Sequence, residues 1–331
     1  METSKAHAFE RRYDRIDELN KASFYMNDAF RPFDVMMSVH SAGRPREKID
    51  KDGMSSEEVE RLNSKNKAAR FILGGNMSTV VLPDGKVPYG PTDMDDEGRL
   101  ADARANMNRY FESIGVDPAQ VRVLNPERDY STPLTVVNAD EDHGEYNGMQ
   151  PVRLEKSGDF VYTFNPEIVL AVRPADCPIA VFTSETPDGR IYGMIHFAWR
   201  GPASGQFEDM ARAFSQLGVD TDSLNVYVTP GGHAEDYQFA RYVPDGKNNP
   251  KPVEGALFTN VRTNDDGSYA FGIDTPYAVY KAFLDLGLKP ERLFLDTSDT
   301  NSLESGYGSH SRAMRQGEDN VRDLVTVQLH S

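Results

Sequence analysis

The chain has 331 residues and a net charge of −16 at neutral pH, which allows a sizeable core in one large domain or two ordinary ones. This acidic balance argues against nucleic acid and against an anionic membrane surface as partners. The single cysteine excludes an internal disulfide, and no apolar run approaches the ~20 residues of a membrane helix. Together with a charged N-terminus that lacks an apolar signal segment, these features predict a cytoplasmic protein.

The N-terminal part of the chain is rich in charge. Apolar residues recur at helical spacing over residues 8–20, which predicts an amphipathic helix that covers the domain or binds a partner. Residues 41–66 predict a loop, with a short helix at 55–63. Short strands are expected at 71–73 and 79–82.

The rest of the chain alternates between strand-like and helix-like patterns. Helices are expected over residues 97–114, 207–217 and 275–286. Strands are expected over residues 121–124, 134–137, 159–163, 167–172, 179–182, 191–195, 225–229, 292–295 and 324–327. Residues 244–268 are polar and rich in Gly, Pro and Asn, so we expect a long surface excursion there. The predicted class is α+β, with mixed sheets and hairpins covered by helices in a layered sandwich.

One predicted hairpin joins the only cysteine of the chain, Cys177, to His196 and to the only tryptophan, Trp199. If Thr183 pairs with Arg190, Cys177 lies directly opposite His196. Opposed residues of an antiparallel pair have Cβ atoms roughly 4.5–5.5 Å apart. A register that differs by one residue would put the two side chains on opposite faces.

A thiol beside an imidazole suits two kinds of chemistry. Thiolate and neutral imidazole bind zinc, which usually has three protein ligands and a water in catalytic sites. Without a metal, Cys177 and His196 form a nucleophile and its base. A buried thiol next to a strand histidine with no catalytic role is the plainer interpretation. The neighbouring Asp176 either orients His196 or a substrate, or bonds the backbone of the turn.

Further polar residues follow predicted strands or helices. Arg200 precedes a Gly-Pro turn into a helix, which predicts a phosphate or carboxylate site, with stacking on Trp199 as the alternative. His233 lies in a glycine-containing loop after a strand, where binding residues often lie. His310 and Arg312 share a polar segment near the C-terminus, where a solvated loop is the simpler reading for His310.

Two of these segments resemble the paired signature of the laccase-domain, or polyphenol oxidase-like, family. They are Ala175-Asp176-Cys177-Pro178 and His196-Phe197-Ala198-Trp199-Arg200-Gly201. The resemblance extends to Asn106, Asp159–Thr163, Thr229-Pro230-Gly231, Ser309–Arg312 and Arg322. It assigns residues 95–331 to a laccase-like domain and leaves 1–94 as a poorly matched extension with the first strands, unless both form one continuous domain.

The resemblance implies a zinc-dependent purine nucleoside phosphorylase with adenosine deaminase activity, whose partners are a small-molecule nucleoside and phosphate. Cys177 and His196 would be metal ligands and, with Arg200, catalytic residues. Asp176, Arg200 and Arg312 would bind the substrate.

One departure concerns the third zinc ligand, which in the family is a histidine. The corresponding stretch here, Leu124–Asp129, has none, and His233 and His143 are the candidates to replace it. The phosphorylase ranks first, and a metal-free Cys–His hydrolase or deamidase is the alternative. The family's fold resembles that of toxin and chemoreceptor deamidases, which use such a dyad, and the missing ligand also favours this alternative. A non-catalytic relative that binds a nucleotide or a protein is the third interpretation.

Overall fold

The computed structural model describes residues 33–37, 86–87, 94–114, 116–126, 133–142, 144, 152–245, 249–297, 299–301, 309–316, 322 and 324–329. The expected helix over 8–20, the loop over 41–66 with its short helix, and the strands at 71–73 and 79–82 lie outside these residues. So do His143 and residues 127–129 of the stretch that lacks the family histidine. Among the described residues, no helix has the length and apolar character needed to cross a membrane.

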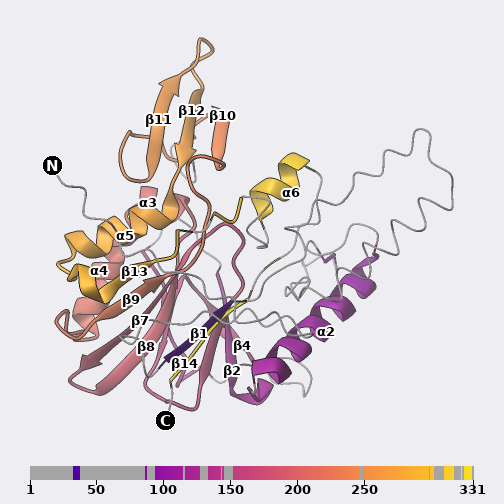
Figure 1. Cartoon of the computed structure of the whole chain (residues 1–331), viewed down its shortest axis with the longest axis vertical. Helices are drawn as coiled ribbons and strands as arrows, with labels where there is room; N and C mark the ends of the chain where they lie inside the picture. Colours follow the sequence, from indigo (N-terminus) through magenta and orange to yellow (C-terminus); the bar gives the residue numbers. More distant parts are fainter. Residues whose placement is uncertain are drawn as a thin grey trace.

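Strands outnumber helices in the described chain (Figure 1). The strands are β1 (Phe33–Met37), β2 (Val121–Asn125), β3 (Val136–Asn138), β4 (Val152–Ser157), β5 (Phe160–Thr163), β6 (Val169–Val172), β7 (Ile179–Thr186), β8 (Gly189–His196), β9 (Asn225–Val228), β10 (Gln238–Tyr242), β11 (Phe258–Thr263), β12 (Tyr269–Ile273), β13 (Leu293–Leu295) and β14 (Val325–Leu329). The helices are α2 (Asp96–Ile114), α3 (Arg200–Ala203), α4 (Gln206–Gln216), α5 (Thr275–Asp285) and α6 (His310–Gln316), with single 3-10 turns at Pro118–Gln120 and Pro290–Arg292.

These strands form a five-stranded, a six-stranded and a three-stranded sheet. The five-stranded sheet has the order β1-β14-β6-β2-β4, and the six-stranded sheet has the order β13-β9-β7-β8-β5-β3. Both combine parallel and antiparallel pairs, since β2 runs parallel to β4 and β6 while β14 is antiparallel to β6. The expected α+β class with mixed sheets and hairpins is confirmed.

The two larger sheets face each other, and helices cover their outer faces. Along β7, Ile179 and Val181 join the apolar cluster between the sheets, whereas Ala180 and Phe182 point toward α4 and α5. On the far side, Met107 of α2 packs on the outer face of the five-stranded sheet. Figure 1 shows α2 on one flank and α4 and α5 on the other. Burying a large apolar side chain stabilises a fold by roughly 1.5–3 kcal/mol, so this alternation drives the layered sandwich.

The surface excursion expected over residues 244–268 contains β11, which joins β10 and β12 in the three-stranded sheet of order β10-β12-β11. This sheet projects from the sandwich at the top of Figure 1. Phe258 and Phe271 pack with Tyr242 and Trp199 in a separate apolar cluster. Aromatic side chains from β10, β11 and β12 that pack with Trp199 therefore stabilise this sheet.

The register of the β7–β8 hairpin also differs from the expected one. Thr183 pairs with Tyr192 and not with Arg190, and Ile179 is the residue opposite His196. Thr186 pairs with Gly189, so the turn is only two residues long, and the φ of +120° at Gly189 suits it. The difference amounts to two residues, which leaves every side chain on the face that was expected.

Gly193 in β8 offers a test of this packing. A Cβ atom there would lie 2.5 Å from the Phe182 ring and closer still to the Val161 carbonyl oxygen. We expect Gly193→Ala to destabilise the protein by about 1–3 kcal/mol, because a packed sheet cannot make room for a methyl group. The measurement is the thermal unfolding midpoint. Gly255→Ala, with no atom closer than 3.9 Å to the new Cβ, is the matched control; equal midpoints for the two variants would contradict the packing.

Candidate functional site

The chemically reactive side chains lie at one end of the strands of the six-stranded sheet. Because β7 is antiparallel to both β8 and β9, its beginning lies beside their ends. Cys177 precedes β7, His196 ends β8 and His233 follows β9. Asp159 precedes β5 and Asp296 follows β13 at the same end, since β5 is antiparallel to β8 and β13 is parallel to β9. The sheet order thus aligns five segments that are far apart in the sequence.

His196 lies on the face of the six-stranded sheet that is directed toward the five-stranded sheet. It is two and four residues after Met194 and Tyr192 on the same strand, and both of these side chains lie in the cluster between the sheets. The second sheet reaches this point as well, because the Asn125 carbonyl at the end of β2 accepts a hydrogen bond from the Gly158 N–H at 3.2 Å. Asn125 is the last residue of β2. The stretch that begins at Leu124, which corresponds to the one with the third histidine of the family, therefore begins next to Asp159.

His196 is held on three sides. Its Nδ1 lies 2.9 Å from Asp159 Oδ1, and its backbone N–H donates to the Asp159 carbonyl at 2.8 Å. Its own carbonyl accepts a 2.8 Å bond from Gln206 Nε2. The Cys177 side chain forms a further hydrogen bond with the ring. Because Nδ1 faces Asp159, Nε2 is the nitrogen left for the sulfur.

The charges around His196 favour its protonated form. Burial alone lowers the pKa of His196, but the neighbouring Cys177 sulfur and the Asp159 carboxylate outweigh it and raise the pKa well above its usual value. The Asp159 side chain is 3% exposed, and its Oδ2 has no hydrogen-bond partner in the described part of the chain. A buried carboxylate of this kind stabilises an imidazolium next to the Cys177 sulfur.

Asp176 lies next to Cys177 but is directed into the protein. Its Oδ1 accepts a 3.0 Å bond from the Thr300 hydroxyl, and its Oδ2 accepts a 2.7 Å bond from the Ser311 N–H in the first turn of α6. Its backbone adopts a φ of +66°, a left-handed conformation that Asp tolerates better than most residues. Asp176 therefore connects the Cys177 segment with the Thr300 segment and with the start of α6.

The two predicted substrate-binding arginines lie on short helices. Arg200 begins α3, where a turn was expected, and its guanidinium carbon lies 4.7 Å from the Trp199 ring centroid. Its Nε also donates to Asn249 Oδ1 at 3.3 Å. Arg312 follows Ser311 in α6, so its backbone lies close to the Cys177 segment. The predicted stacking on Trp199 and the predicted anion site at Arg200 are compatible with this geometry.

His233 was a candidate for the third metal ligand. Its Nδ1 is 3.0 Å from Asp274 Oδ1, and its backbone N–H donates to Asp299 Oδ1 at 3.3 Å. Within the described ranges, no three His, Cys, Asp or Glu side chains are grouped as a metal ion requires. The donor set at Cys177 and His196 comprises two ligands, one fewer than catalytic zinc usually has, so the described residues do not fit a zinc site.

Sequence reasoning missed two residues that position His196. The sequence places Asp159 at the start of a strand and within the family resemblance but gives it no role, whereas the structure places it as the extension of β5 directly opposite His196, given that Phe160 pairs with Ile195. Gln206 was not considered, because nothing in the sequence connects a helix-starting glutamine with a carbonyl ten residues before it. The signal for Asp159 is a carboxylate just before a buried strand that pairs with the strand of the histidine.

Asp176 can be tested by two substitutions. We expect Asp176→Ala to lower the free energy of unfolding by roughly 1–3 kcal/mol, because it removes the carboxylate that accepts hydrogen bonds from the part-buried Ser311 N–H and the buried Thr300 hydroxyl. Asp176→Asn keeps one acceptor oxygen and the left-handed preference, so it should cost less. Thermal or urea unfolding measures both. Wild-type stability for the Ala variant would contradict this structural role.

Comparison with known proteins agrees with the fold and the motifs. Residues 88–320 match the family described as multi-copper polyphenol oxidoreductase laccase. No curated protein matches the sequence. Among solved structures, hypothetical protein YfiH from Bacillus licheniformis superposes with a TM-score of 0.53 at 18% identity, over 76% of this chain and 89% of the other. YlmD from Geobacillus stearothermophilus superposes with a TM-score of 0.53 at 21% identity, over 74% and 87%.

At these identities the two structures support the fold alone, whereas the family match spans most of the chain and includes both motifs around Cys177 and His196. The chain therefore belongs to the multi-copper polyphenol oxidoreductase laccase family.

Proposed function

We propose that Cys177, His196 and Asp159 form the catalytic centre of a thiol-dependent hydrolase or deamidase. The observation that carries this proposal is the position of His196, which lies between a buried carboxylate at Nδ1 and the Cys177 sulfur. A nucleophile, a base in hydrogen-bonding contact with it, and a third group that orients the base are the parts required for covalent catalysis.

Each residue has a distinct role in this reaction. The Cys177 sulfur forms a bond to the carbonyl or amidine carbon of the substrate while the bond from that carbon to the leaving atom breaks, and the His196 imidazolium gives its proton to that atom. Asp159 is a positioning residue, since it holds the ring through Nδ1 and makes no contact with the sulfur. Cys177 and His196 are partly exposed, so a substrate can reach them.

Alkylation of the single cysteine tests the thiolate directly. We expect iodoacetamide to modify Cys177 near pH 6 about tenfold faster than it modifies a free cysteine, because the positive charge of His196 lies against the attacking sulfur. The pH profile of the alkylation rate, followed by mass spectrometry, provides the measurement.

Two variants supply the controls. Asp159→Asn removes a charge that raises the pKa of His196, so the imidazolium is lost at lower pH and alkylation near neutral pH slows. His196→Gln removes the imidazolium and should slow it further. If both variants react as fast as the wild type, His196 does not activate Cys177, and the proposal fails.

Purine nucleoside phosphorolysis is the second candidate, because family membership favours it. The nucleoside and phosphate would then bind near Cys177, with Arg200 and Arg312 as the phosphate-binding residues and Asp176 as a further substrate contact. Arg200 supports this candidate through its fixed guanidinium on Trp199. A zinc ion would require a third ligand in addition to Cys177 and His196.

Metal content and product analysis separate the two candidates. We expect protein purified without added zinc to contain well below one zinc per chain, because the described donors are one short. The measurement combines elemental analysis with an assay for base release from inosine and adenosine in phosphate buffer. About one zinc per chain that disappears in Cys177→Ala, together with phosphate-dependent base release, would instead support the second candidate.

A further inference from the structure

The arginine that follows the end of β8 is held in place by the projecting three-stranded sheet. Arg200 is the fourth residue after His196 and begins α3, which lies at the base of this sheet (Figure 1). Its guanidinium carbon lies 4.7 Å from the centroid of the Trp199 ring, and its Nε donates to Asn249 Oδ1 at 3.3 Å. Because Asn249 lies between β10 and β11, two separate parts of the fold fix this side chain.

The Trp199 ring that supports Arg200 is itself packed among aromatic rings of the three-stranded sheet. Trp199 is 6% exposed. The ring centroids of Phe239, Tyr242 and Phe258 lie 5.8–6.0 Å from its own, in tilted or edge-to-face contacts of the kind that aromatic pairs favour. The guanidinium of Arg200 therefore rests on a surface that has little freedom to move.

The orientation of the Asn249 amide follows from its other partner. Asn249 Nδ2 donates to Asp245 Oδ2 at 2.6 Å, and an ionised carboxylate accepts hydrogen bonds without donating any. The amide nitrogen must face Asp245, so Oδ1 is the atom that faces Arg200. The Asn249 N–H also donates to Asp245 Oδ1 at 3.0 Å, and the Asp245 N–H donates to the Asn249 carbonyl at 3.1 Å. Asp245 thus fixes Asn249, and Asn249 in turn fixes Arg200.

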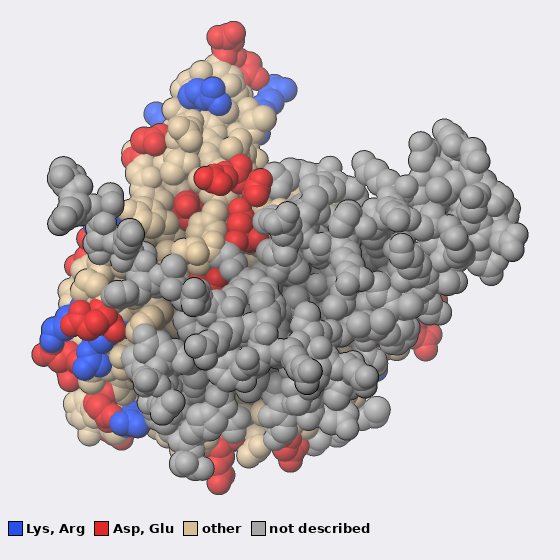
Figure 2. Space-filling view, viewed as in Figure 1, with Lys and Arg blue, Asp and Glu red and all other residues tan. Residues whose placement is uncertain are grey.

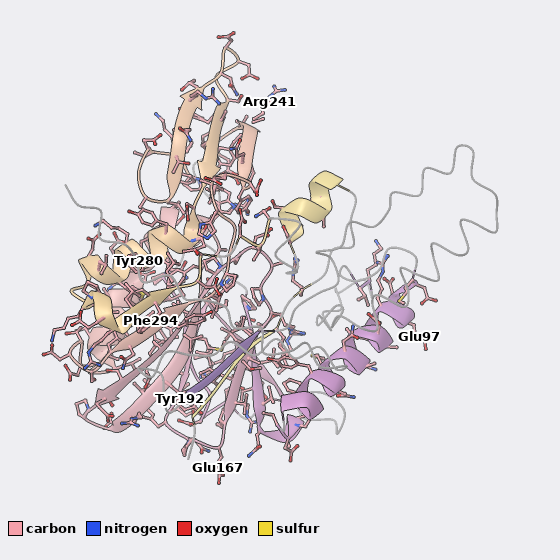
Figure 3. All side chains as sticks on the ribbon, viewed as in Figure 1. Glu97, Glu167, Tyr192, Arg241, Tyr280 and Phe294 are labelled. Atoms are coloured by element: carbon pink, nitrogen blue, oxygen red, sulfur yellow. The ribbon has the colours of Figure 1, made fainter. Side chains whose placement is uncertain are left out.

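These contacts hold Arg200 without neutralising its charge. Arg241 of β10, labelled in Figure 3, lies 3.0 Å from the Asp266 carboxylate. Arg190 lies 2.7 Å from Glu185, and on the face shown in Figure 2 basic side chains lie next to acidic ones in the same way. Arg200, by contrast, forms no ion pair within the described ranges. A neutral amide stands where these other arginines have a carboxylate.

The terminal nitrogens of Arg200 are available to a ligand. Neither Nη1 nor Nη2 has a hydrogen-bond partner in the described part of the chain. A guanidinium presents these two nitrogens as a planar fork that matches two oxygens of a carboxylate or a phosphate. Because the side chain is already held by Trp199 and Asn249, it loses little conformational freedom when an anion binds. A fixed and uncompensated guanidinium in a chain of net charge −16 is therefore suited to an anion.

We propose that Asn249 is a positioning residue that holds Arg200 for an anionic ligand, a carboxylate or a phosphate, so that the three-stranded sheet is the specificity element of the site. The inference goes beyond the proposed reactions, in which this sheet has no role. It rests on the proposed function only for the source of the anion. In the thiol-dependent reaction the anion is a charged group of the substrate, and in phosphorolysis it is the phosphate.

The only tryptophan of the chain reports binding at Arg200 directly. The full-length protein is titrated with sodium phosphate and, separately, with sodium acetate at constant ionic strength, and the Trp199 fluorescence is recorded. We expect a saturable change with at least one of these anions, and the two salts separate a phosphate site from a carboxylate site. Arg200→Gln should abolish it. Asn249→Ala should raise the Kd about tenfold, which corresponds to the loss of one hydrogen bond to a charged group.

Substitutions of Asp245 separate positioning from simple electrostatics by their sign. Removing a negative charge near Arg200 tightens anion binding if charge alone matters. If Asp245 acts by orienting Asn249, Asp245→Ala weakens binding instead, because the amide is released. Asp245→Asn keeps an acceptor for Asn249 and should restore the wild-type Kd or a lower one. Asp245 is exposed, so both variants should keep the wild-type unfolding midpoint.

Controls make each outcome decisive. Arg262→Gln, the same change at an exposed arginine of β11, should leave the Kd unchanged. No saturable change in the wild type, or an equal loss in Arg262→Gln and Arg200→Gln, would overturn the anion site. A wild-type Kd in Asn249→Ala, or tighter binding in Asp245→Ala, would overturn the positioning role. The readout requires no turnover, so its failure leaves the thiol-dependent function standing, and failure of the Cys177 alkylation test leaves this inference standing.

Discussion

The pairing of β8 with both of its neighbours is the constraint on which the candidate site depends. On one side, His196 lies opposite Ile179, two residues after Cys177; on the other, it lies opposite Asp159, whose carbonyl accepts its N–H at 2.8 Å. A one-residue change in either register would turn His196 or its partners to the opposite face. The cluster between the sheets prevents such a change, because Tyr192 and Met194 would then leave it. The register that packs the core is therefore also the register that forms the site.

Much of the fold could be predicted from the sequence because buried apolar residues recur along each strand and helix with the period of that element. Strands such as β6 and β7 are apolar on both faces, as expected for strands between a second sheet and a helix layer, and the layered α+β class follows. Exact register could not be predicted, since Pro187-Asp188-Gly189 allows turns of different length and only the packing of Gly193 against Phe182 and Val161 selects one. The three-stranded sheet could not be predicted because its aromatic side chains pack on Trp199, which is about forty to sixty residues earlier in the chain than Phe239, Tyr242 and Phe258.

The candidate site was predictable to the extent that it is local in sequence. Cys177 and His196 lie in two short motifs joined by one hairpin, and the structure brings them into contact although the expected register was two residues off. Asp159 and Gln206 act on His196 from other elements, so pairing and helix packing had to be known first. Asp176 illustrates the reverse case: its motif points to chemistry, while both of its carboxylate oxygens bond the surrounding loops.

The two histidines at this end of the six-stranded sheet have the same Nδ1–carboxylate contact, yet their surroundings differ. Burial lowers the pKa of both, and the groups around each outweigh it and raise the pKa. For His196 these groups are Asp159 and the Cys177 sulfur, whereas for His233 they are Asp274, Asp299 and Asp296. Only His196 therefore combines an orienting carboxylate with a candidate nucleophile, which is why the proposed chemistry lies at the end of β8.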